Sequence, residues 1–400
     1  MKKLFIIILG ITLAYIIFIS LKINRFYKKI YTPKDKKIRE EKNQFNFLIF
    51  GYGGGKHEGT YLTDTIMIFH VDIKNKKAAL ISLPRDLWVP LPKKDGSKFF
   101  SKINAIYQME LFPESYPQIN NKFLGKKDDA ALTKFIVSKI FSIPIDYYVA
   151  VDFEGFKKAI DILGGIDVNV EKSFTDPAYP IDGKENDLCD EETEKMFKEV
   201  EQFLKPGYNP EDKERLLKEN PKLDEFLKNA TESPNLAFPC RYETLFFKKG
   251  KTHMNGETAL KYARSRHSLE DGSDFSRAHR QHLLLEAVKN KILSLNLITK
   301  APNLLDQLGD HFKTDFPLSD LAKFSKEVLN IKNYQFFNYI LSNKNFLQDS
   351  ISDDGQYILI PKDGENSWNE IQKSIKKIFE GIDPQTTPTP TPKITKSNNN

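Results

Sequence analysis

A group of cationic and polar residues suited to anion binding lies between residues 251 and 281. Its members are Arg264, Arg266, Asp274, Arg277, Arg280 and Gln281. An ordinary solvated face is the usual explanation for clustered charges. Here, however, the arginines alternate with small and apolar residues instead of glutamate partners. Planar guanidinium groups bind phosphate oxygens in pairs, so the cluster predicts a site for a diphosphate or polyphosphate.

The first half of this group is predicted to follow a short helix. Asn255 suits the N-cap of a helix over residues 256–263, because its side-chain oxygen can accept hydrogen bonds from free backbone N–H groups. Arg264 and Arg266 come directly after it. Residues two apart share one side only on extended chain, so we interpret this segment as extended.

The second half is predicted to open another helix, from Phe275 to about Ser294, capped by Ser273 or Asp274. This helix would carry Arg277 and Gln281 in its first two turns. Cations at a helix N-terminus oppose the helix dipole. Together with the free backbone N–H groups, however, they form a strong anion site. The placement therefore favours a bound anion.

Length and composition limit the class of protein. The chain has 400 residues, enough for one large domain or two small ones, and its formal net charge is +6. This mild charge argues against a nucleic-acid partner, for which a strongly basic domain or stripe is expected. Two cysteines are present, without a CxxC motif or the Cys/His spacing of a zinc site.

The N-terminus is predicted to anchor the protein in a membrane. Residues 1–24 contain an apolar run of about twenty residues, long enough to span a bilayer as a helix. A cleavable signal peptide is the alternative, but no small-x-small cleavage motif follows the run. Residues 25–44 are charged and contain proline, as in a tether. Basic residues flank both ends of the run, and their count slightly favours placing the following domain in the cytoplasm.

The globular part is predicted to begin with a strand over residues 45–50. The glycine-rich loop 51–59 that follows resembles a phosphate loop, but a dinucleotide-binding fold requires a helix next. Two apolar runs follow instead and read as a hairpin of buried strands. Asp64 precedes the first of these strands, and Arg85 and Asp86 follow the second. Charged residues commonly end strands at the surface. The alternative is that Asp64 and Arg85 reach the same sheet edge and act together.

The rest of the chain alternates strands and helices, which predicts a layered α/β domain. We assign residues 45–300 to the main domain and residues 301–381 to a C-terminal α/β extension. A Lys/Glu-rich stretch, 180–240, is predicted to be an insertion of two or three surface helices. Residues 382–400 are rich in proline and threonine and too polar to pack, so we expect a disordered tail.

Cys189 and Cys240 bracket the insertion. In an oxidising compartment, a bond between them would stabilise the fold by roughly 4 kcal/mol on the loop-entropy model. In a reducing compartment they remain two free thiols. The residues alone leave both states open.

Eight segments, in order along the chain, carry a family resemblance. They are NFLIFG, LTDTIMIF, ISLPRDLWV, KINAIY, YYVAVDFEGF, LGGIDVNV, HMNGETALKYARSRH and SDFSRAHRQ. With these segments the chain resembles the LytR-CpsA-Psr family of membrane-anchored cell-envelope enzymes, over roughly residues 45–300 and more faintly to 380. The resemblance implies an α–β–α sandwich with a central mixed sheet outside the cytoplasmic membrane and a short cytoplasmic N-terminus. It also favours the oxidised state of Cys189 and Cys240.

The resemblance further implies an activity in cell-wall biogenesis. Members move a glycopolymer from a polyprenyl-pyrophosphate carrier to a sugar hydroxyl of peptidoglycan, usually with Mg²⁺. The family's pyrophosphate-binding residues fall on Arg85, Arg264, Arg266, Arg277 and Gln281. Asp64, Arg85 and Arg266 are the predicted catalytic residues, and Asp64 would hold Mg²⁺ or accept the hydroxyl proton. These groups are expected to share one pocket.

Four lesser assignments and two departures complete this interpretation. Asp86 and Arg280 are secondary candidates, and Asp274 is expected to cap its helix and orient Arg266 or Arg277. Many members have an aspartate and an arginine where this chain has Gly53 and Leu62. His57 or Glu58 would replace the missing ligand, unless their loop is simply a turn. The departures keep two alternatives open, namely a pyrophosphatase and a non-catalytic protein that binds lipid-linked glycans.

Overall fold

The structure is a computed structural model of the chain. It describes residues 21–31, 43–55, 60–124, 129–203, 205, 208–294, 308–317, 320, 324, 327 and 331–382. The predicted anchor and tail, and both His57 and Glu58, lie wholly or almost wholly outside these residues. Among the described residues, no helix combines the length and apolarity needed to cross a bilayer. The chain divides into two compact units, Met1–Gly164 with Lys289–Asn400 and Gly165–Val288.

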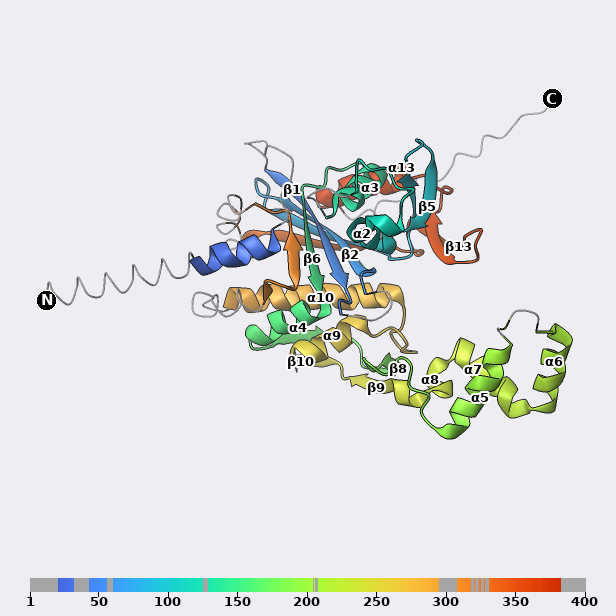
Figure 1. The fold of residues 1–400 in the computed structure, drawn as a ribbon. Helices are drawn as coiled ribbons and strands as arrows, with labels where there is room; N and C mark the ends of the chain where they lie inside the picture. The colour runs from blue at the N-terminus through green and yellow to red at the C-terminus, as the bar shows by residue number, and fades with distance from the viewer. Residues whose placement is uncertain are drawn as a thin grey trace, which may run out of the picture. The chain divides into compact units, whose positions relative to one another are not determined.

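A six-stranded mixed sheet forms the centre of the first unit (Figure 1). Its order is β11 (Phe312–Thr314), β6 (Tyr147–Asp152), β1 (Gln44–Tyr52), β2 (Thr63–Asp72), β3 (Lys77–Leu83) and β12 (Gln335–Ile340). The middle strands β1, β2 and β3 are antiparallel neighbours, whereas β6 and β12 run parallel to the strands they join. The predicted mixed sheet and hairpin are therefore confirmed. The element that follows the glycine-rich loop is strand β2. A dinucleotide-binding fold would have a helix at this position, so its rejection is confirmed.

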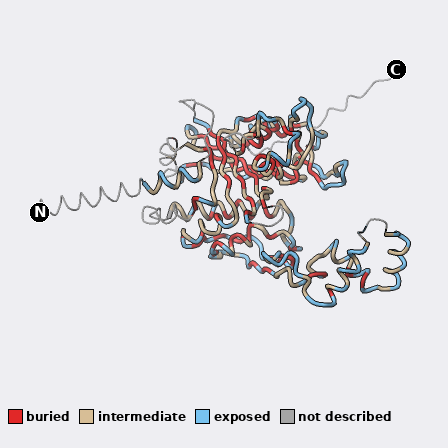
Figure 2. Tube along the Cα trace, viewed as in Figure 1, coloured by how far each residue is buried: buried red, intermediate tan, exposed pale blue. Residues whose placement is uncertain are grey.

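Alternate residues of the central strands enter two apolar layers, because successive side chains of a strand point to opposite faces. Phe47 of β1 packs on Phe316 with ring centroids 5.4 Å apart. Phe50 points the other way and lies 5.1 Å from Tyr107. Helices α2 (Ile106–Leu111), α3 (Ala131–Phe141) and α13 (Asn369–Phe379) cover this second face. The central strands are accordingly the most continuously buried part of the chain (Figure 2).

The C-terminal segment is part of this sheet. Strands β11 and β12 form its two edges, and α13 packs on α3 and β3. The region predicted as an extension therefore shares the core of the first unit. A buried ion pair ties it to α3: Lys134 Nζ binds Asp315, which is completely buried and whose second oxygen accepts a 2.7 Å bond from the Tyr148 N–H.

Outside residues 180–240, the described part of the second unit consists of two small antiparallel ribbons and two helices. The ribbons are β7 (Ile166–Val170) with β10 (Gly250–Met254), and β8 (Phe174–Pro180) with β9 (Tyr242–Phe247). The helices are α9 (Gly256–Arg264) and the part of α10 (Asp274–Ser294) that ends at Val288. Gly164 and Gly165 adopt positive φ angles of 76° and 75° at the turn into β7, which glycine tolerates without a Cβ clash.

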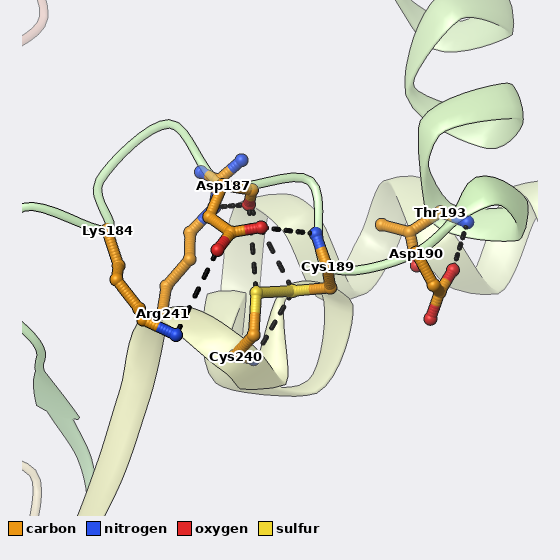
Figure 3. Close-up of a disulfide and its surroundings, with 7 residues drawn as sticks. All are labelled: Lys184, Asp187, Cys189, Asp190, Thr193, Cys240 and Arg241. Carbon is orange, nitrogen blue, oxygen red and sulfur yellow. Dashed lines mark hydrogen bonds and ion pairs between the residues drawn. A yellow bond between two sulfur atoms is a disulfide. The ribbon is translucent and has the colours of Figure 1, made fainter.

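The predicted insertion is helical, but its described residues form four α-helices, more than the two or three predicted. They are α5 (Glu191–Gln202), α6 (Pro210–Glu219), α7 (Pro221–Glu232) and α8 (Pro234–Ala237). Phe238 packs between Phe197 and Phe226, with ring centroids 6.0 and 5.4 Å away, so these helices share a small core. Cys189 and Cys240 form a disulfide beside it, with an S–S distance of 2.10 Å (Figure 3).

Candidate anion-binding site

Asp64 and Arg85 lie side by side at one end of the central strands, where β2 begins and β3 ends. Ile66 of β2 lies opposite Leu83 of β3, so the start of one strand adjoins the end of the other. Arg85 Nη1 donates a 2.8 Å hydrogen bond to Asp64 Oδ1. The prediction that these residues reach the same edge is confirmed, although Asp64 lies within β2 and not before it.

The two neighbouring carboxylates differ in their surroundings. Both oxygens of Asp86 face cations, since Oδ1 lies 2.8 Å from Lys102 Nζ and Oδ2 lies 3.5 Å from Arg85 Nε. The Asp86 side chain is only 12% exposed, whereas that of Asp64 is 40% exposed. Asp64 is therefore the better carboxylate for an incoming ligand, and Asp86 holds Arg85 in place.

A magnesium ion fits this edge only as an ion shared with the substrate. Mg²⁺ is commonly held by one or two carboxylates together with phosphate oxygens and water. Asp64 can supply one such carboxylate. Over the described part of the chain, the one group of three ligand-type residues close enough to hold an ion is Asp187, Cys189 and Cys240. Its sulfurs are joined in the disulfide, so it offers no alternative metal site.

In the second unit, the predicted first helix is present, but it includes Arg264, so the prediction that Arg264 and Arg266 share one extended segment is wrong. Asn255 caps α9 by accepting a 2.8 Å bond from the Thr258 N–H. The helix ends at Arg264, and Ser265 is extended with φ −53° and ψ 135°. The Arg264 guanidinium lies 3.2 Å from the Tyr179 hydroxyl and 3.4 Å from Asp182. Burial raises the pKa of Tyr179 to about 12, although Arg264 opposes this, so the phenol stays protonated at neutral pH.

Arg266 and Arg277 are drawn together by Asp274. The Asp274 carboxylate lies 4.0 Å from Arg266 Nη1 and 3.6 Å from Arg277 Nη2. Asp274 thus orients both arginines, as predicted, but it does not cap the helix. The cap is Ser273, whose hydroxyl accepts a 3.1 Å bond from the Ser276 N–H. The first turn of α10 therefore gathers two guanidinium groups around one carboxylate.

Gln281 and Arg280 connect α10 to the chain leaving α9. Gln281 Nε2 donates a 3.4 Å bond to the carbonyl oxygen of Ala263. Arg280 is 1% exposed and donates to backbone oxygens of Tyr262, Ser265 and Asp271 and to the Asp271 carboxylate. Buried in this way, Arg280 shapes the loop and does not face a ligand, in agreement with its low rank in the sequence interpretation.

Two residues near the cluster escaped the sequence interpretation. Arg266 Nε donates a 3.3 Å hydrogen bond to His267 Nε2, which must be unprotonated to accept it, so the imidazole is neutral. Desolvation and the positive charge of Arg266 lower the pKa of His267, in agreement with that state. Asp176 of β8 is completely buried and binds the segment that carries Arg266. No local sequence signal identifies Asp176, because its partners lie about ninety residues away along the chain.

The structure therefore brings the predicted residues together in two groups. Asp64 and Arg85 belong to the first unit, and the cluster on α9 and α10 belongs to the second. Within the second group, Arg266 and Arg277 share one carboxylate, while Arg264 has different partners. The single pocket predicted to contain both groups stays a prediction.

The described residues thus form an α/β protein with a mixed sheet, and two arginines lie at a helix N-terminus, an arrangement chemically suited to a phosphate-type anion. The model of the LytR_cpsA_psr family matches residues 16–376. The chain belongs to this family.

Individual relatives are more distant. The chain is 28% identical over 291 residues to the polyisoprenyl-teichoic acid–peptidoglycan teichoic acid transferase TagV of Bacillus subtilis, a match that covers 72% of this chain but 54% of TagV. It thus spans about half the length of that relative. TagU of Enterococcus faecalis, a transferase of the same description, is 24% identical over 371 residues, with 88% of this chain and 91% of TagU covered.

Solved structures agree on the fold. The crystal structure of B. subtilis TagV superimposes with a TM-score of 0.52 at 23% sequence identity, covering 86% of this chain and all of that one. A Streptococcus agalactiae protein, gbs0355, gives a TM-score of 0.53 at 18% identity, with 84% and 88% covered. At such identities the likeness concerns the fold alone.

Proposed function

We propose that this protein is a phosphotransferase that moves a glycopolymer from a polyprenyl-pyrophosphate carrier to a sugar hydroxyl of peptidoglycan. The observation that carries this proposal is the pair of guanidinium groups, Arg266 and Arg277, held by one carboxylate at the N-terminus of α10. Family membership and the printed descriptions of TagV and TagU, both teichoic acid transferases, support the substrate class.

In the reaction, the sugar hydroxyl oxygen attacks the glycan-side phosphorus, and the bond from that phosphorus to the polyprenyl phosphate breaks. The polyprenyl phosphate leaves with the bonding electron pair, and the hydroxyl proton passes to a base. Negative charge spreads over the phosphoryl oxygens in the transition state, where fixed cations lower its energy more than that of the ground state. Arg264, Arg266 and Arg277 bind the diphosphate, with Gln281 fixing the chain around them.

Asp64 and Arg85 serve the same reaction in this proposal. Asp64 would accept the hydroxyl proton or would be the carboxylate that holds Mg²⁺. When bound, Mg²⁺ neutralises charge on the phosphate oxygens. Arg85 orients the Asp64 carboxylate through their 2.8 Å hydrogen bond.

A reconstituted reaction tests the function. The full chain in detergent micelles is incubated with a polyprenyl-pyrophosphate glycan, Mg²⁺ and peptidoglycan oligomers, and a parallel reaction contains EDTA. We expect polymer covalently attached to peptidoglycan, with much less product under EDTA. Released phosphorylated glycan without attachment would identify a pyrophosphatase instead. Unchanged lipid that co-purifies with the protein would identify a glycan-binding protein. Equal product with EDTA would remove Mg²⁺ from the mechanism.

We also propose that the protein is a single-pass membrane protein whose domain, an α–β–α sandwich, lies outside the cytoplasmic membrane. Its carrier substrate is a membrane lipid, so an anchor over residues 1–24 would keep the domain close to its supply. The disulfide Cys189–Cys240 supports this side of the membrane, because disulfides seldom persist in the reducing cytoplasm.

Thiol labelling tests this location. Cells are quenched with acid, and the denatured protein is treated with a maleimide of high mass. Both cysteines should resist the reagent until a reductant is added, and the protein should then gain two adducts. Two adducts without reductant would place the domain in a reducing compartment.

A further inference from the structure

The carboxylate of Asp176 is the main anchor of the segment that carries Arg266. Asp176 lies on β8, completely buried, beside an irregularity in the pairing of β8 with β9. Its Oδ2 atom accepts three hydrogen bonds, from Ser265 Oγ at 2.6 Å, Arg266 N at 3.0 Å and His267 N at 3.2 Å. Oδ1 accepts a fourth from Ala178 N at 3.0 Å. Three consecutive residues are thus fixed by one oxygen atom.

Arg280 holds the same segment as a hydrogen-bond donor, whereas Asp176 holds it as an acceptor. Its guanidinium donates to the Ser265 carbonyl oxygen, while Asp176 accepts from the Ser265 hydroxyl. Gly272 packs closely against the backbone of this segment. A Cβ atom at position 272 would lie only 2.9 Å from the Arg266 carbonyl oxygen. The backbone at Arg266 therefore has little freedom, which fixes the point from which its side chain leaves the loop.

Asp176 is ionised at neutral pH despite its burial. Burial alone would raise the pKa of this carboxyl, but the bonds from Ser265, Ala178, His267 and Arg266 outweigh it and hold the pKa below its usual value. Its hydrogen bonds are therefore charge-assisted, which makes them shorter and stronger than neutral ones.

We propose that Asp176 is a positioning residue, which fixes the backbone of Ser265–His267 so that the Arg266 guanidinium is aimed at the diphosphate. This rests on the proposed function for the identity of the anion. The residue does not touch substrate and acts only through Arg266. An arginine on a fixed backbone loses less freedom when it binds than an arginine on a loose loop, whose backbone would also have to be ordered by the ligand.

Asp176→Asn tests the proposal with little change of shape. The asparagine oxygen can face either the three donors or the Ala178 N–H, and its NH₂ group then opposes a donor on the other side. We expect affinity for inorganic pyrophosphate, measured by calorimetry on the full chain in micelles, to fall about 10-fold. Transfer should show a lower kcat/KM, with a higher KM because ground-state binding is weaker and a lower kcat because the transition-state charge is less well stabilised.

A double-mutant cycle separates positioning from general damage. In an Arg266→Ala background, Asp176→Asn should cost less than about 2-fold in pyrophosphate affinity, since its effect passes through the missing side chain. Ser265→Ala, which removes one of the three donors, should give a smaller loss of the same kind. It keeps the test open if Asp176→Asn folds poorly. Asp190→Asn is the matched control, because Asp190 caps α5 and asparagine caps equally well.

The outcomes distinguish this inference from the proposed function. If the protein binds pyrophosphate but does not transfer glycopolymer, the proposed function is wrong. The double-mutant cycle, measured by pyrophosphate affinity, would still decide the role of Asp176. Wild-type affinity in a folded Asp176→Asn variant, or a full 10-fold loss in the Arg266→Ala background, would overturn the positioning role.

Discussion

Replacing Arg277 by alanine should lower kcat/KM for glycopolymer transfer about 10²- to 10³-fold, the effect of removing one fixed donor from a charged transition state. Arg277 is 7% exposed, and its guanidinium lies 3.6 Å from Asp274 at the first turn of α10. Its charge is thus held in a site with little water, where electrostatic interactions are stronger than at the surface. Initial rates of polymer attachment measure the effect.

Two further variants serve as controls for the effect of Arg277→Ala. Arg277→Lys keeps the charge but lacks the planar fork, so it should recover only part of the activity. Arg215→Ala removes an exposed arginine of α6 that pairs with Asp212, and should transfer at the wild-type rate. Thermal unfolding should show that Arg277→Ala is folded at the assay temperature. A folded Arg277→Ala variant with wild-type kcat/KM would exclude Arg277 from the site.

Local signals in the sequence predicted the elements that carry the site. Asn255 caps α9 as expected because an N-cap needs only its own side chain and the next few N–H groups. Asp64 and Arg85 were correctly brought to one edge, since they flank a short hairpin whose register is fixed by its alternating buried residues. In both cases the interacting residues are close in sequence.

Features that depend on residues far apart in the sequence were harder to predict from the sequence. Ser273 and Asp274 both suit an N-cap, and the ion pairs of Asp274 with Arg266 and Arg277 decide between them. The role of Asp176 depends on a segment that β8 meets only in the folded chain. Strands β11 and β12 follow the same rule, because their place at the sheet edges is set by pairing with β6 and β3 and not by their own short sequences.

The ion pair between Lys134 and Asp315 is another such feature, and breaking it should have the largest effect on stability. We expect Lys134→Met to lower the free energy of unfolding by about 3–5 kcal/mol, because it leaves the Asp315 carboxylate completely buried without its cation. Asp315 retains the bond from the Tyr148 N–H, which cannot replace a full opposite charge. Chemical denaturation followed by fluorescence measures the change.

Removing the charge as well as its partner should restore much of the loss. In the double variant Lys134→Met with Asp315→Asn, the asparagine oxygen can still accept from Tyr148 N–H, and no unpaired charge is buried. Lys139→Met, on the exposed side of the same helix, is the matched control and should change stability by less than about 0.5 kcal/mol. If Lys134→Met unfolds at the wild-type denaturant concentration, the pair contributes nothing to joining α3 to the C-terminal segment. If the double variant is less stable than the single one, the buried charge is not the cause of the loss.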